Sequence, residues 1–432
     1  MLPDQNDRWV ERDAVRVWHG FTQMASFAEN RPVMVERGEG RELIGVDGRR
    51  YLDAISSLWV NTLGHRVPEL DSAIKDQLDR VAHSTLLGNG NTVVVELSEA
   101  LAEVVPVDDP RFLFASDGAS AVEQALKIAF QYWWNRGETG RTSYLVLGDG
   151  YHGDTVGSLS LGDSGFGTEL FDPLRFGQVV RTPGYNDAGW ADNAIAALHS
   201  NAERLVAAVL EPLVQGASGM YVADPDEVAR FGRACQDAGV LLICDEVATG
   251  FGRTGTMFAS GQCGLQPDVL CLGKGLSGGY LPMSATVASG RVAGEFLGED
   301  LGTRTFYHGH SFGGNPLAAA VALRHLQLFD DWHVLDNVSA RSDQLAKRLS
   351  PLRASPHISD VRIKGLMAAV ELAPPAPGLR WGRRVCAAAV ERGVLLRPLG
   401  DVVVLMPILT STAAEVDRIA DTLEAAIEEV CA

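Results

Sequence analysis

The stretch Leu241 to Gly255 reads LLICDEVATGFGRTG, an apolar run that ends abruptly in two carboxylates. A short apolar run of this kind predicts a strand buried on both faces, as in parallel sheets covered by helices. Ligand crevices in such sheets lie beyond the carboxyl ends of the strands, which is where Asp245 stands. We therefore expect an α/β fold in which Asp245 either caps the next loop or pairs with a buried cation.

The sequence before this strand alternates short apolar runs with amphipathic segments, which predicts βαβ units and a mostly parallel sheet. Apolar residues repeat at helical spacing from Val122 to Trp133, and Gly137 is the expected stop. A second helix is predicted from Pro225, with Asp224 as its N-cap, Glu227 at the capping-box position and Gly239 after its end. The expected strands are Arg111 to Ala115, Tyr144 to Leu147, Leu205 to Leu210 and Val240 to Cys244.

The pattern of the sequence changes after about residue 330, which predicts that a separate, smaller domain begins there. Residues 1–60 are expected to contribute to a small domain and to the active site, residues 61–330 to form the large domain, and residues 331–432 to form a smaller α+β domain. In the last part we expect a strand over Val361 to Leu372, and Thr412 with Glu415 as the capping box of the terminal helix. The other elements expected there are a helix over Trp381 to Arg392 and strands over Val394 to Leu396 and Val402 to Met406.

The composition excludes several classes of protein. Of the 432 residues 46% are hydrophobic, and the formal net charge of −18 opposes binding to nucleic acids and to anionic membranes. Met1 to Asp13 lacks the apolar stretch of a secretory signal, so a cytoplasmic location is expected. The six cysteines form no C-x-x-C pair, and a disulfide scaffold is not expected.

A lysine between glycines marks the next motif, Leu270 to Tyr280, which reads LCLGKGLSGGY. Glycines on both sides leave room for a planar ligand, and a partly desolvated Lys274 would have the lowered pKa that Schiff-base chemistry needs. A solvated lysine in a glycine-rich turn is an equally good interpretation of this motif alone. A nucleotide-binding P-loop, as in an ATPase, fails on spacing, because Asp268 stands where a glycine is required and Gly275 where a Ser or Thr is required.

Two further segments could bind a flat, phosphorylated ligand. Gly118 and Ala119 lie at the predicted start of a helix, where free backbone N–H groups attract anions, although an ordinary Asp or Ser cap explains the same residues. Tyr151, in GYHGDT, could stack on a ring or simply pack on the surface. No metal site is predicted, because His308 and His310 lack further ligands at a suitable spacing and His152 is isolated.

Together these motifs resemble the pyridoxal-phosphate enzymes of the aspartate-aminotransferase fold, fold type I, in the order found in class III aminotransferases. Within that family the resemblance is greatest to the 7,8-diaminopelargonate synthases of biotin biosynthesis, and it extends over almost the whole chain. It implies an α/β fold with a large, mostly parallel sheet domain and a smaller α+β domain. The matching stretches include SSLW (56–59), ALKIAFQYW (125–133), GYHGDT (150–155), EPLVQGASGM (211–220), CDEVATGFGRTG (244–255), GKGLSGGYLP (273–282), YHGHSFGGNPLA (307–318) and LLRPLGD (395–401).

The resemblance implies a role for each matched residue. Lys274 would bind pyridoxal phosphate as a Schiff base, Asp245 would pair with its ring nitrogen, and Tyr151 would stack on the ring. Gly118 and Ala119 would hold the phosphate, and His310 and Ser311 would reach the phosphate of the neighbouring subunit, which implies a homodimer with shared sites. The implied substrate contacts are Trp59, Gly309, Arg397, Phe21, Tyr151 and Lys274, with Arg397 facing the carboxylate of the keto-acid acceptor; the supporting residues are Glu211, Asp154 and Arg253.

The implied reaction converts 7-keto-8-aminopelargonate to 7,8-diaminopelargonate, with S-adenosylmethionine as the amino donor. Phe21 stands where the family often has a tyrosine, and FTQM (21–24) with HSTLLG (83–88) resembles a branch that can use lysine as donor. EPLVQG lacks the second Glu of the E-P-x-x-x-E stretch of ornithine and γ-aminobutyrate enzymes. Another class III ω-aminotransferase remains the alternative within the family.

Overall fold

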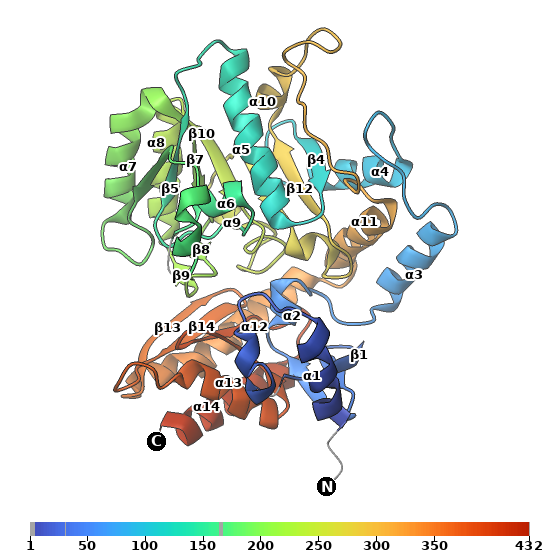
Figure 1. Ribbon diagram of the computed structural model, residues 1–432, viewed down its shortest axis with the longest axis vertical. Helices are drawn as coiled ribbons and strands as arrows, with labels where there is room; N and C mark the ends of the chain where they lie inside the picture. The colour runs from blue at the N-terminus through green and yellow to red at the C-terminus, as the bar shows by residue number, and fades with distance from the viewer. Residues whose placement is uncertain (1–4, 31, 164–166, 432) are drawn as a thin grey trace.

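A computed structural model describes residues 5–30, 32–163 and 167–431. Figure 1 shows one large sheet with its helices in the upper part of the molecule, and two smaller sheets with helices α12, α13 and α14 in the lower part, where both termini also lie. Within the described ranges, no helix is both long and apolar enough to cross a membrane.

The large sheet has seven strands in the order β4-β12-β11-β10-β7-β5-β6. All its strands run in one direction except β12, which is antiparallel to both β11 and β4. The predicted mostly parallel α/β sheet is therefore confirmed. The strands are β4 (Arg111–Ala115), β5 (Ser143–Leu147), β6 (Val179–Thr182), β7 (Leu205–Leu210), β10 (Leu241–Asp245), β11 (Val269–Leu272) and β12 (Ser284–Ala288).

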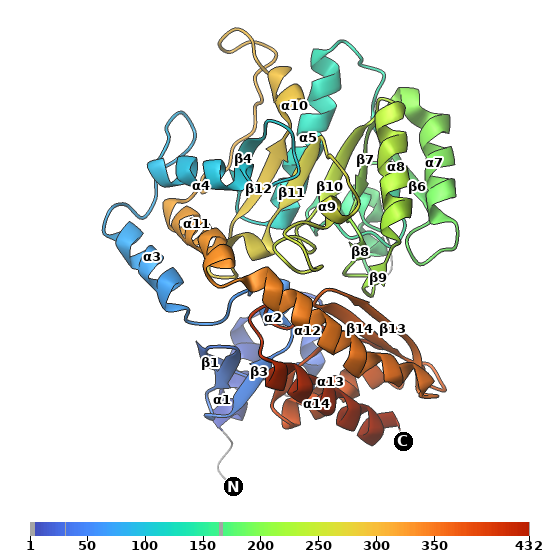
Figure 2. The same ribbon diagram turned by 180° about the vertical axis from the view of Figure 1, so that it is seen from behind.

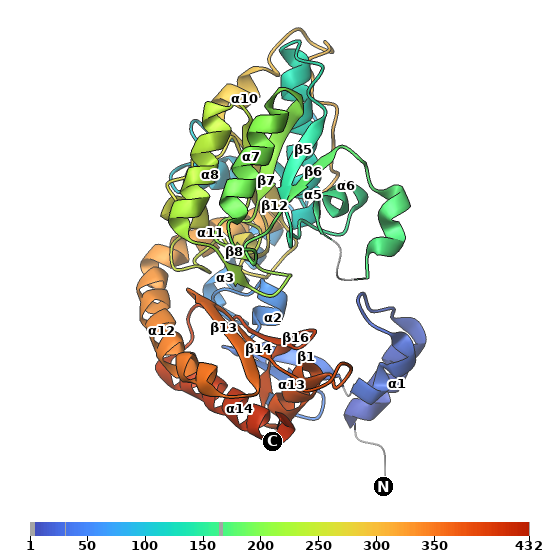
Figure 3. The same cartoon turned by 90° about the vertical axis from the view of Figure 1, so that its left-hand side faces the viewer.

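Helices cover both faces of this sheet. Figure 3 shows α5 (Gly118–Asn135) and α6 (Val156–Leu161) on one side, and α7 (Trp190–Asn201) and α8 (Pro225–Asp237) on the other. Alternate residues of a strand face opposite sides. In β10, Ile243 accordingly packs in the core beneath α5, whereas Leu242 and Cys244 pack in the core that includes α8. Seen from behind in Figure 2, α4 (Thr92–Ala102), α9 (Ala259–Gln262) and α11 (Pro316–Asp331) lie on the same side as α8.

Two four-stranded sheets lie outside the large sheet, and one of them combines strands from both ends of the chain. One has the order β1-β2-β3-β15, and β15 pairs in parallel with β3 through Val394↔Leu52 and Leu395↔Asp53. The other has the order β13-β14-β17-β16. The domain boundaries near residues 60 and 330 stay a prediction. The strands are β1 (Val35–Glu39), β2 (Glu42–Gly45), β3 (Arg50–Asp53), β13 (Ile358–Lys364), β14 (Met367–Leu372), β15 (Val394–Leu395), β16 (Arg397–Leu399) and β17 (Val402–Leu405).

One expected element is wrong: the single strand over Val361 to Leu372 is a hairpin. β13 and β14 pair antiparallel, and the turn between them contains Gly365 with φ +62°. A side chain at Gly365 would start 2.4 Å from the backbone oxygen of Arg253, so this turn needs glycine for space as well as for conformation.

The helix ends follow the capping signals with one difference. The Asp224 side chain accepts from the backbone N–H of Asp226, and Thr412 and Glu415 exchange the hydrogen bonds of a capping box. Glu227 instead accepts from the indole N–H of Trp190. The remaining α-helices are α1 (Gln5–Arg16), α2 (Ser56–Trp59), α3 (Pro68–Leu78), α10 (Gly290–Gly294), α12 (Val334–Leu349), α13 (Trp381–Glu391) and α14 (Ala413–Cys431), and the remaining short strands are β8 (Val214–Gln215) and β9 (Tyr221–Val222).

Candidate active site

A cavity of about 500 Å³ lies where the carboxyl ends of β4, β5, β7, β10 and β11 converge. Each strand is followed at once by a polar or glycine-rich loop, and these loops bring together residues that are far apart in the sequence. Six predicted site residues line the cavity: Trp59, Gly118, Ala119, Tyr151, Asp245 and Lys274. The position agrees with the general placement of ligands in open α/β sheets.

Asp245 ends β10 and is almost fully buried. Its Oδ1 accepts from the backbone N–H of Val247 at 3.1 Å, and its Oδ2 lies 2.8 Å from Nδ1 of His152. Burial lowers the pKa of His152, but the hydrogen bond and the charge of Asp245 outweigh burial and leave the pKa above its ordinary value. The hydrogen bond to His152 therefore fixes the direction of the Asp245 carboxylate.

His152 was not among the predicted site residues, because it stands isolated in the sequence. Ninety-three residues separate His152 from Asp245, and no local spacing connects them. The available signal was its position next to Tyr151, in the loop that follows the β5 strand.

Lys274 begins the short helix Lys274–Ser277, directly after β11, with φ +36°. Its ammonium lies 5.5 Å from the centre of the Trp59 ring. Burial lowers its pKa from the ordinary value, although Asp245 and Glu211 act in the opposite direction. Among the five lysines of the sequence, it is the one that lines this cavity. A lysine with a lowered pKa is suited to Schiff-base formation and proton transfer.

Gly118 and Ala119 form the first turn of α5, which points its free N–H groups at the cavity. Asp117 also caps this helix by accepting from the backbone N–H of Ser120 at 2.8 Å, so the cap and the anion site are compatible. A side chain at Gly118 would start 2.6 Å from Cγ1 of Val247, and one at Gly153 would start 2.5 Å from Cβ of Ala119. Glycines therefore let the three loops approach closely around the helix start.

Tyr151 is fixed at both ends by carboxylates. Its backbone N–H donates to Oε1 of Glu211 at 3.1 Å, and its hydroxyl donates to Oδ2 of Asp154 at 2.9 Å. Burial raises the pKa of Glu211 to about 7, and burial also raises the pKa of the Tyr151 hydroxyl, with Asp154 adding to the effect. Glu211 and Asp154 thus hold Tyr151 at the wall of the cavity.

The turn Ser56–Trp59 brings Trp59 to the cavity in a rare conformation. Its four residues have φ of +49°, +48°, +74° and +70°, so the turn is left-handed. Within the described ranges this is the longest run of non-glycine residues with positive φ. A left-handed residue costs roughly 1–2 kcal/mol, so four of them need substantial compensation from their surroundings.

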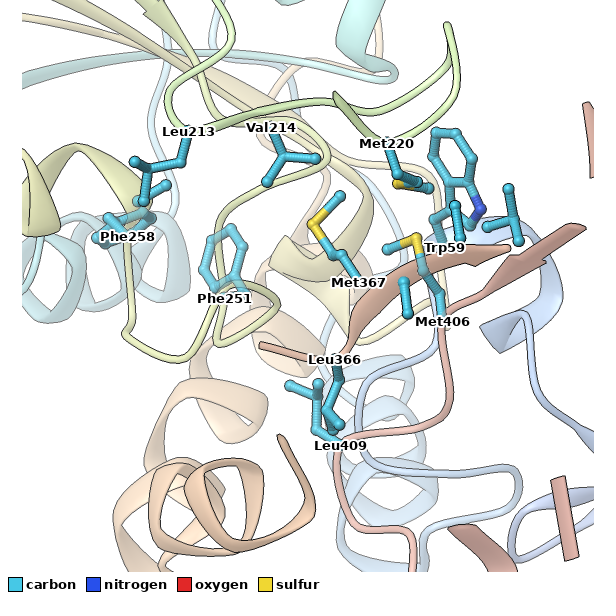
Figure 4. Packing of buried hydrophobic residues seen from close by; sticks show 14 of the residues in the cluster. Trp59, Leu213, Val214, Met220, Phe251, Phe258, Leu366, Met367, Met406 and Leu409 are labelled. Atoms are coloured by element: carbon cyan, nitrogen blue, oxygen red, sulfur yellow. The ribbon is translucent and has the colours of Figure 1, made fainter. Parts of the chain in front are cut away.

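Trp59 is 94% buried by this placement, since only 6% of its surface is exposed. Figure 4 shows it beside Met220, Met367 and Met406. Its Nε1 is buried and has no hydrogen-bond partner within the described ranges. A buried donor of this kind at a cavity is suited to an acceptor atom of a ligand.

Arg253 is a fully buried guanidinium that joins three segments around this turn. It donates to the carbonyl oxygens of Asn61 at 2.7 Å, of Pro407 at 2.9 Å and of Trp59 at 3.4 Å. Burial lowers its pKa to about 10. Its hydrogen bonds satisfy backbone carbonyls, which places Arg253 among the supporting residues.

Five predicted site residues lie outside the lining of this cavity: Phe21, Gly309, His310, Ser311 and Arg397. Phe21 is 68% exposed. Gly309 packs near Leu87, and the next aromatic residue along the loop, Phe312, packs against His83. Arg397 is half-buried on β16, and burial lowers its pKa. Within one chain, the cavity therefore contains only part of the predicted site, and these five residues do not line it.

The donor set fits pyridoxal phosphate. A carboxylate at a strand end, a helix start that is free for an anion, an aromatic wall and a lysine of lowered pKa surround one cavity. The model of the family "Aminotransferase class-III" matches residues 24–427. The chain belongs to the class III aminotransferases, and it is a pyridoxal-phosphate-dependent aminotransferase of fold type I, as its sequence predicts.

The chain is also similar to individual aminotransferases whose activities are given in their names. An adenosylmethionine-8-amino-7-oxononanoate aminotransferase of Nitratidesulfovibrio vulgaris is 43% identical over 96% of this chain and 80% of its own length. The crystal structure of the enzyme of that name from Methanocaldococcus jannaschii has a TM-score of 0.94 and 38% identity, covering 98% of both chains. A PLP-bound amine transaminase from an uncultivated Pseudomonas species has a TM-score of 0.90 and 33% identity, covering 96% of this chain and 99% of its own. The ATPase alternative is thereby overturned.

Proposed function

We propose that this enzyme transfers an amino group to 7-keto-8-aminopelargonate (8-amino-7-oxononanoate) to form 7,8-diaminopelargonate, a step of biotin biosynthesis. S-adenosylmethionine is the proposed donor, and lysine is the alternative donor. The observation that carries this proposal is the 43% identity, over nearly the whole chain, to a relative named for this reaction. The placement of Trp59 and Lys274 at one cavity supports it.

Gly216 supports the choice within the family. It stands where ornithine and γ-aminobutyrate enzymes have their second Glu, and a side chain on it would start 3.5 Å from Cζ3 of Trp59. The backbone N–H of Gly216 donates to Oε2 of Glu211 at 3.1 Å. The apolar indole ring thus takes the side of the cavity that those relatives line with a carboxylate, which suits a long aliphatic acceptor.

Each residue of the cavity would have its own role in the transfer of the amino group. When bound, pyridoxal phosphate supplies an aldehyde that can carry an amino group and a ring that can withdraw electrons. Lys274 would hold the aldehyde carbon, and its amine, once displaced by the donor, would carry a proton away from the donor carbon. Asp245, held by His152, would keep the ring nitrogen protonated, and Tyr151 would cover the ring.

The helix start at Gly118 and Ala119 would hold the phosphate. Arg397 would face the carboxylate of the acceptor, since a guanidinium can bind a carboxylate through two hydrogen bonds. Phe21, with no hydroxyl, would form an apolar part of the donor site.

A homodimer is part of the proposal. His310 and Ser311 lie outside the cavity of their own chain, as residues that complete a partner's site would. Large apolar side chains are also exposed along α5 and the loop before α11: Phe130, Trp134, Tyr307 and Phe312. Surfaces of this kind mark protein interfaces. A cytoplasmic location completes the proposal.

A second candidate is an ω-transaminase that acts on other amines. Solved ω-transaminases at 27–32% identity have TM-scores of 0.91–0.92, so the fold alone does not separate the two activities. The substrate separates them: a 7-keto-8-aminopelargonate transaminase must turn over that acceptor.

The deciding experiment supplies the keto acid with donor labelled at its amino group with ¹⁵N, either S-adenosylmethionine or lysine, and detects the diamine by mass spectrometry. The expected result is ¹⁵N at one amine of the product. Absence of diamine with both donors, together with turnover of simple amines, would assign the enzyme to the second candidate. Borohydride reduction followed by digestion should place the cofactor on Lys274.

A further inference from the structure

The left-handed turn Ser56–Trp59 is held at each end by a different group. At its start, the Ser56 hydroxyl donates to the carbonyl of Met406 at 2.6 Å. At its end, Arg253 donates to the carbonyl of Trp59. Between these two contacts, Ser57 and Leu58 are exposed.

Asp53 holds the middle of the turn. Its Oδ1 accepts from the backbone N–H of Ser57 at 2.9 Å, and its Oδ2 accepts from the Ser57 hydroxyl at 2.7 Å. The Asp53 side chain is fully buried at the end of β3, so its position is set by the sheet and does not depend on the turn.

A series of hydrogen bonds from Gly64 through Asn61 and His65 also holds Asp53 in place. The backbone N–H of Gly64 donates to Oδ1 of Asn61 at 2.7 Å, so the Asn61 amide nitrogen faces His65 and donates to its Nδ1 at 3.1 Å. The other ring nitrogen of His65 must then carry the proton, and it donates to Oδ2 of Asp53 at 3.0 Å. Each member of this network has a partner, so the carboxylate has a single orientation.

We propose that Asp53 is a positioning residue. By holding Ser57 it keeps the turn Ser56–Trp59 left-handed, and the left-handed turn fixes the Trp59 indole at the cavity where the acceptor binds. This inference rests on the proposed role of Trp59 as an acceptor contact. Asp53 does not line the cavity, so its effect on the acceptor would pass through the turn.

Two kinds of substitution test the proposal on the cofactor-loaded enzyme. Asp53→Ala removes the acceptor for Ser57. Leu58→Val leaves every hydrogen bond in place but puts a β-branched residue at φ +74°, which strains the left-handed turn directly. Both variants are expected to raise KM for the keto acid about tenfold, a change of about 1.4 kcal/mol, with kcat within about twofold of wild type. Leu78→Val, a similarly exposed leucine on α3, is the matched control and should change neither constant.

Rescue separates positioning from general support of the fold. Leu58→Gly favours positive φ at no steric cost, so adding it to Asp53→Ala should reverse most of the rise in KM. Asp53→Asn keeps one oxygen for the Ser57 N–H and should raise KM less than Asp53→Ala. A normal KM for Asp53→Ala, a normal KM for Leu58→Val, or a failure of Leu58→Gly to rescue would overturn the proposal.

Hydrogen–deuterium exchange gives a readout that needs no substrate. The backbone N–H groups of Trp59 and Val60 donate to the carbonyls of Ile55 and Ser56 across the turn, at 2.8 and 3.0 Å. Asp53→Ala and Leu58→Val should speed exchange in peptides covering residues 55–61, and the rescue variant should slow it again. If wild type fails to turn over the keto acid, the proposed function falls, and exchange alone still decides whether Asp53 holds the turn. Unchanged exchange in Asp53→Ala would refute that role.

Discussion

His152 and Asp245 form the innermost pair of the site, with Nδ1 of the imidazole 2.8 Å from Oδ2 of the carboxylate and both side chains buried. The imidazole is the carboxylate's hydrogen-bonding partner inside the protein. It therefore sets the direction in which Asp245 can meet a ligand.

His152→Ala should weaken binding of pyridoxal phosphate. A hydrogen bond to a charged group contributes about 1.5–3 kcal/mol, so the dissociation constant should rise roughly ten- to hundredfold. Absorbance titration of stripped protein with the cofactor measures this constant. His199→Ala, at an exposed position on α7, is the control and should bind like wild type. Equal affinities for all three proteins would show that His152 does not orient Asp245.

Glu211 should make the stripped protein less stable as the pH rises. Its folded pKa of about 7 lies above its ordinary value of 4.5, so the folded state holds the proton more tightly and stability falls between about pH 4.5 and 7. At about 1.4 kcal/mol per pKa unit, the loss is roughly 3 kcal/mol. His152, whose pKa is also raised, contributes stability below about pH 6.5 that is lost as the pH rises through its folded pKa.

Urea unfolding from pH 4.5 to 8 isolates the part due to Glu211. The free energy of unfolding of Glu211→Gln should fall less steeply than that of wild type, whereas Glu96→Gln, at an exposed position, should follow wild type. Parallel curves for wild type and Glu211→Gln would refute the raised pKa.

Gly153→Ala should push the Tyr151 loop away from the start of α5. Gly153 has φ +124°, and an added Cβ would lie 2.5 Å from Cβ of Ala119 and 2.8 Å from Oγ of Ser158. We expect a loss of about 1–3 kcal/mol in unfolding free energy and weaker cofactor binding. Gly140→Ala adds a Cβ with nothing within 4 Å and should stay within about 0.5 kcal/mol of wild type. A stable variant with normal cofactor affinity would mean that the loops have room to separate.

Mixing two inactive variants tests whether two chains share each site. Lys274→Ala carries its defect in its own cavity, whereas a His310→Ala/Ser311→Ala double variant would carry it in the partner's site. After subunit exchange, heterodimers would hold one intact site each, and about a quarter of wild-type activity should return. The control mixes Lys274→Ala with Asp245→Ala; both residues line the same cavity, so no activity should return. Equal results from the two mixtures would exclude shared sites.

Sequence patterns within a few residues predicted the strand ends and helix caps that depend on local geometry. The ends of β4 and β7, the N-cap Asp224 and the capping box at Thr412 follow from periodicity and hydrogen-bonding chemistry within a few residues. The position of Asp245 at a ligand crevice followed from the rule that ligands bind at the carboxyl ends of parallel strands, whereas its place beside Lys274 was implied by the family resemblance.

Features set by distant contacts escaped prediction. Nothing near His152 in the sequence indicates that its partner is Asp245. The stretch SSLW has no glycine to announce four left-handed residues, since their conformation is imposed by Asp53, Arg253 and the Met406 carbonyl. The hairpin at Gly365 was missed because the single glycine between two strand-like runs was not treated as a turn.

The pairing of β3 with β15 has a consequence for the order in which the protein assembles during translation. Leu52 and Asp53 leave the ribosome long before Val394 and Leu395, with which they pair. The nascent chain can build its large sheet while β3 still lacks this neighbour. Asp53, and the turn that depends on it, should thus settle only when synthesis is nearly complete, which makes the enzyme inactive in any product that stops short of its last strands.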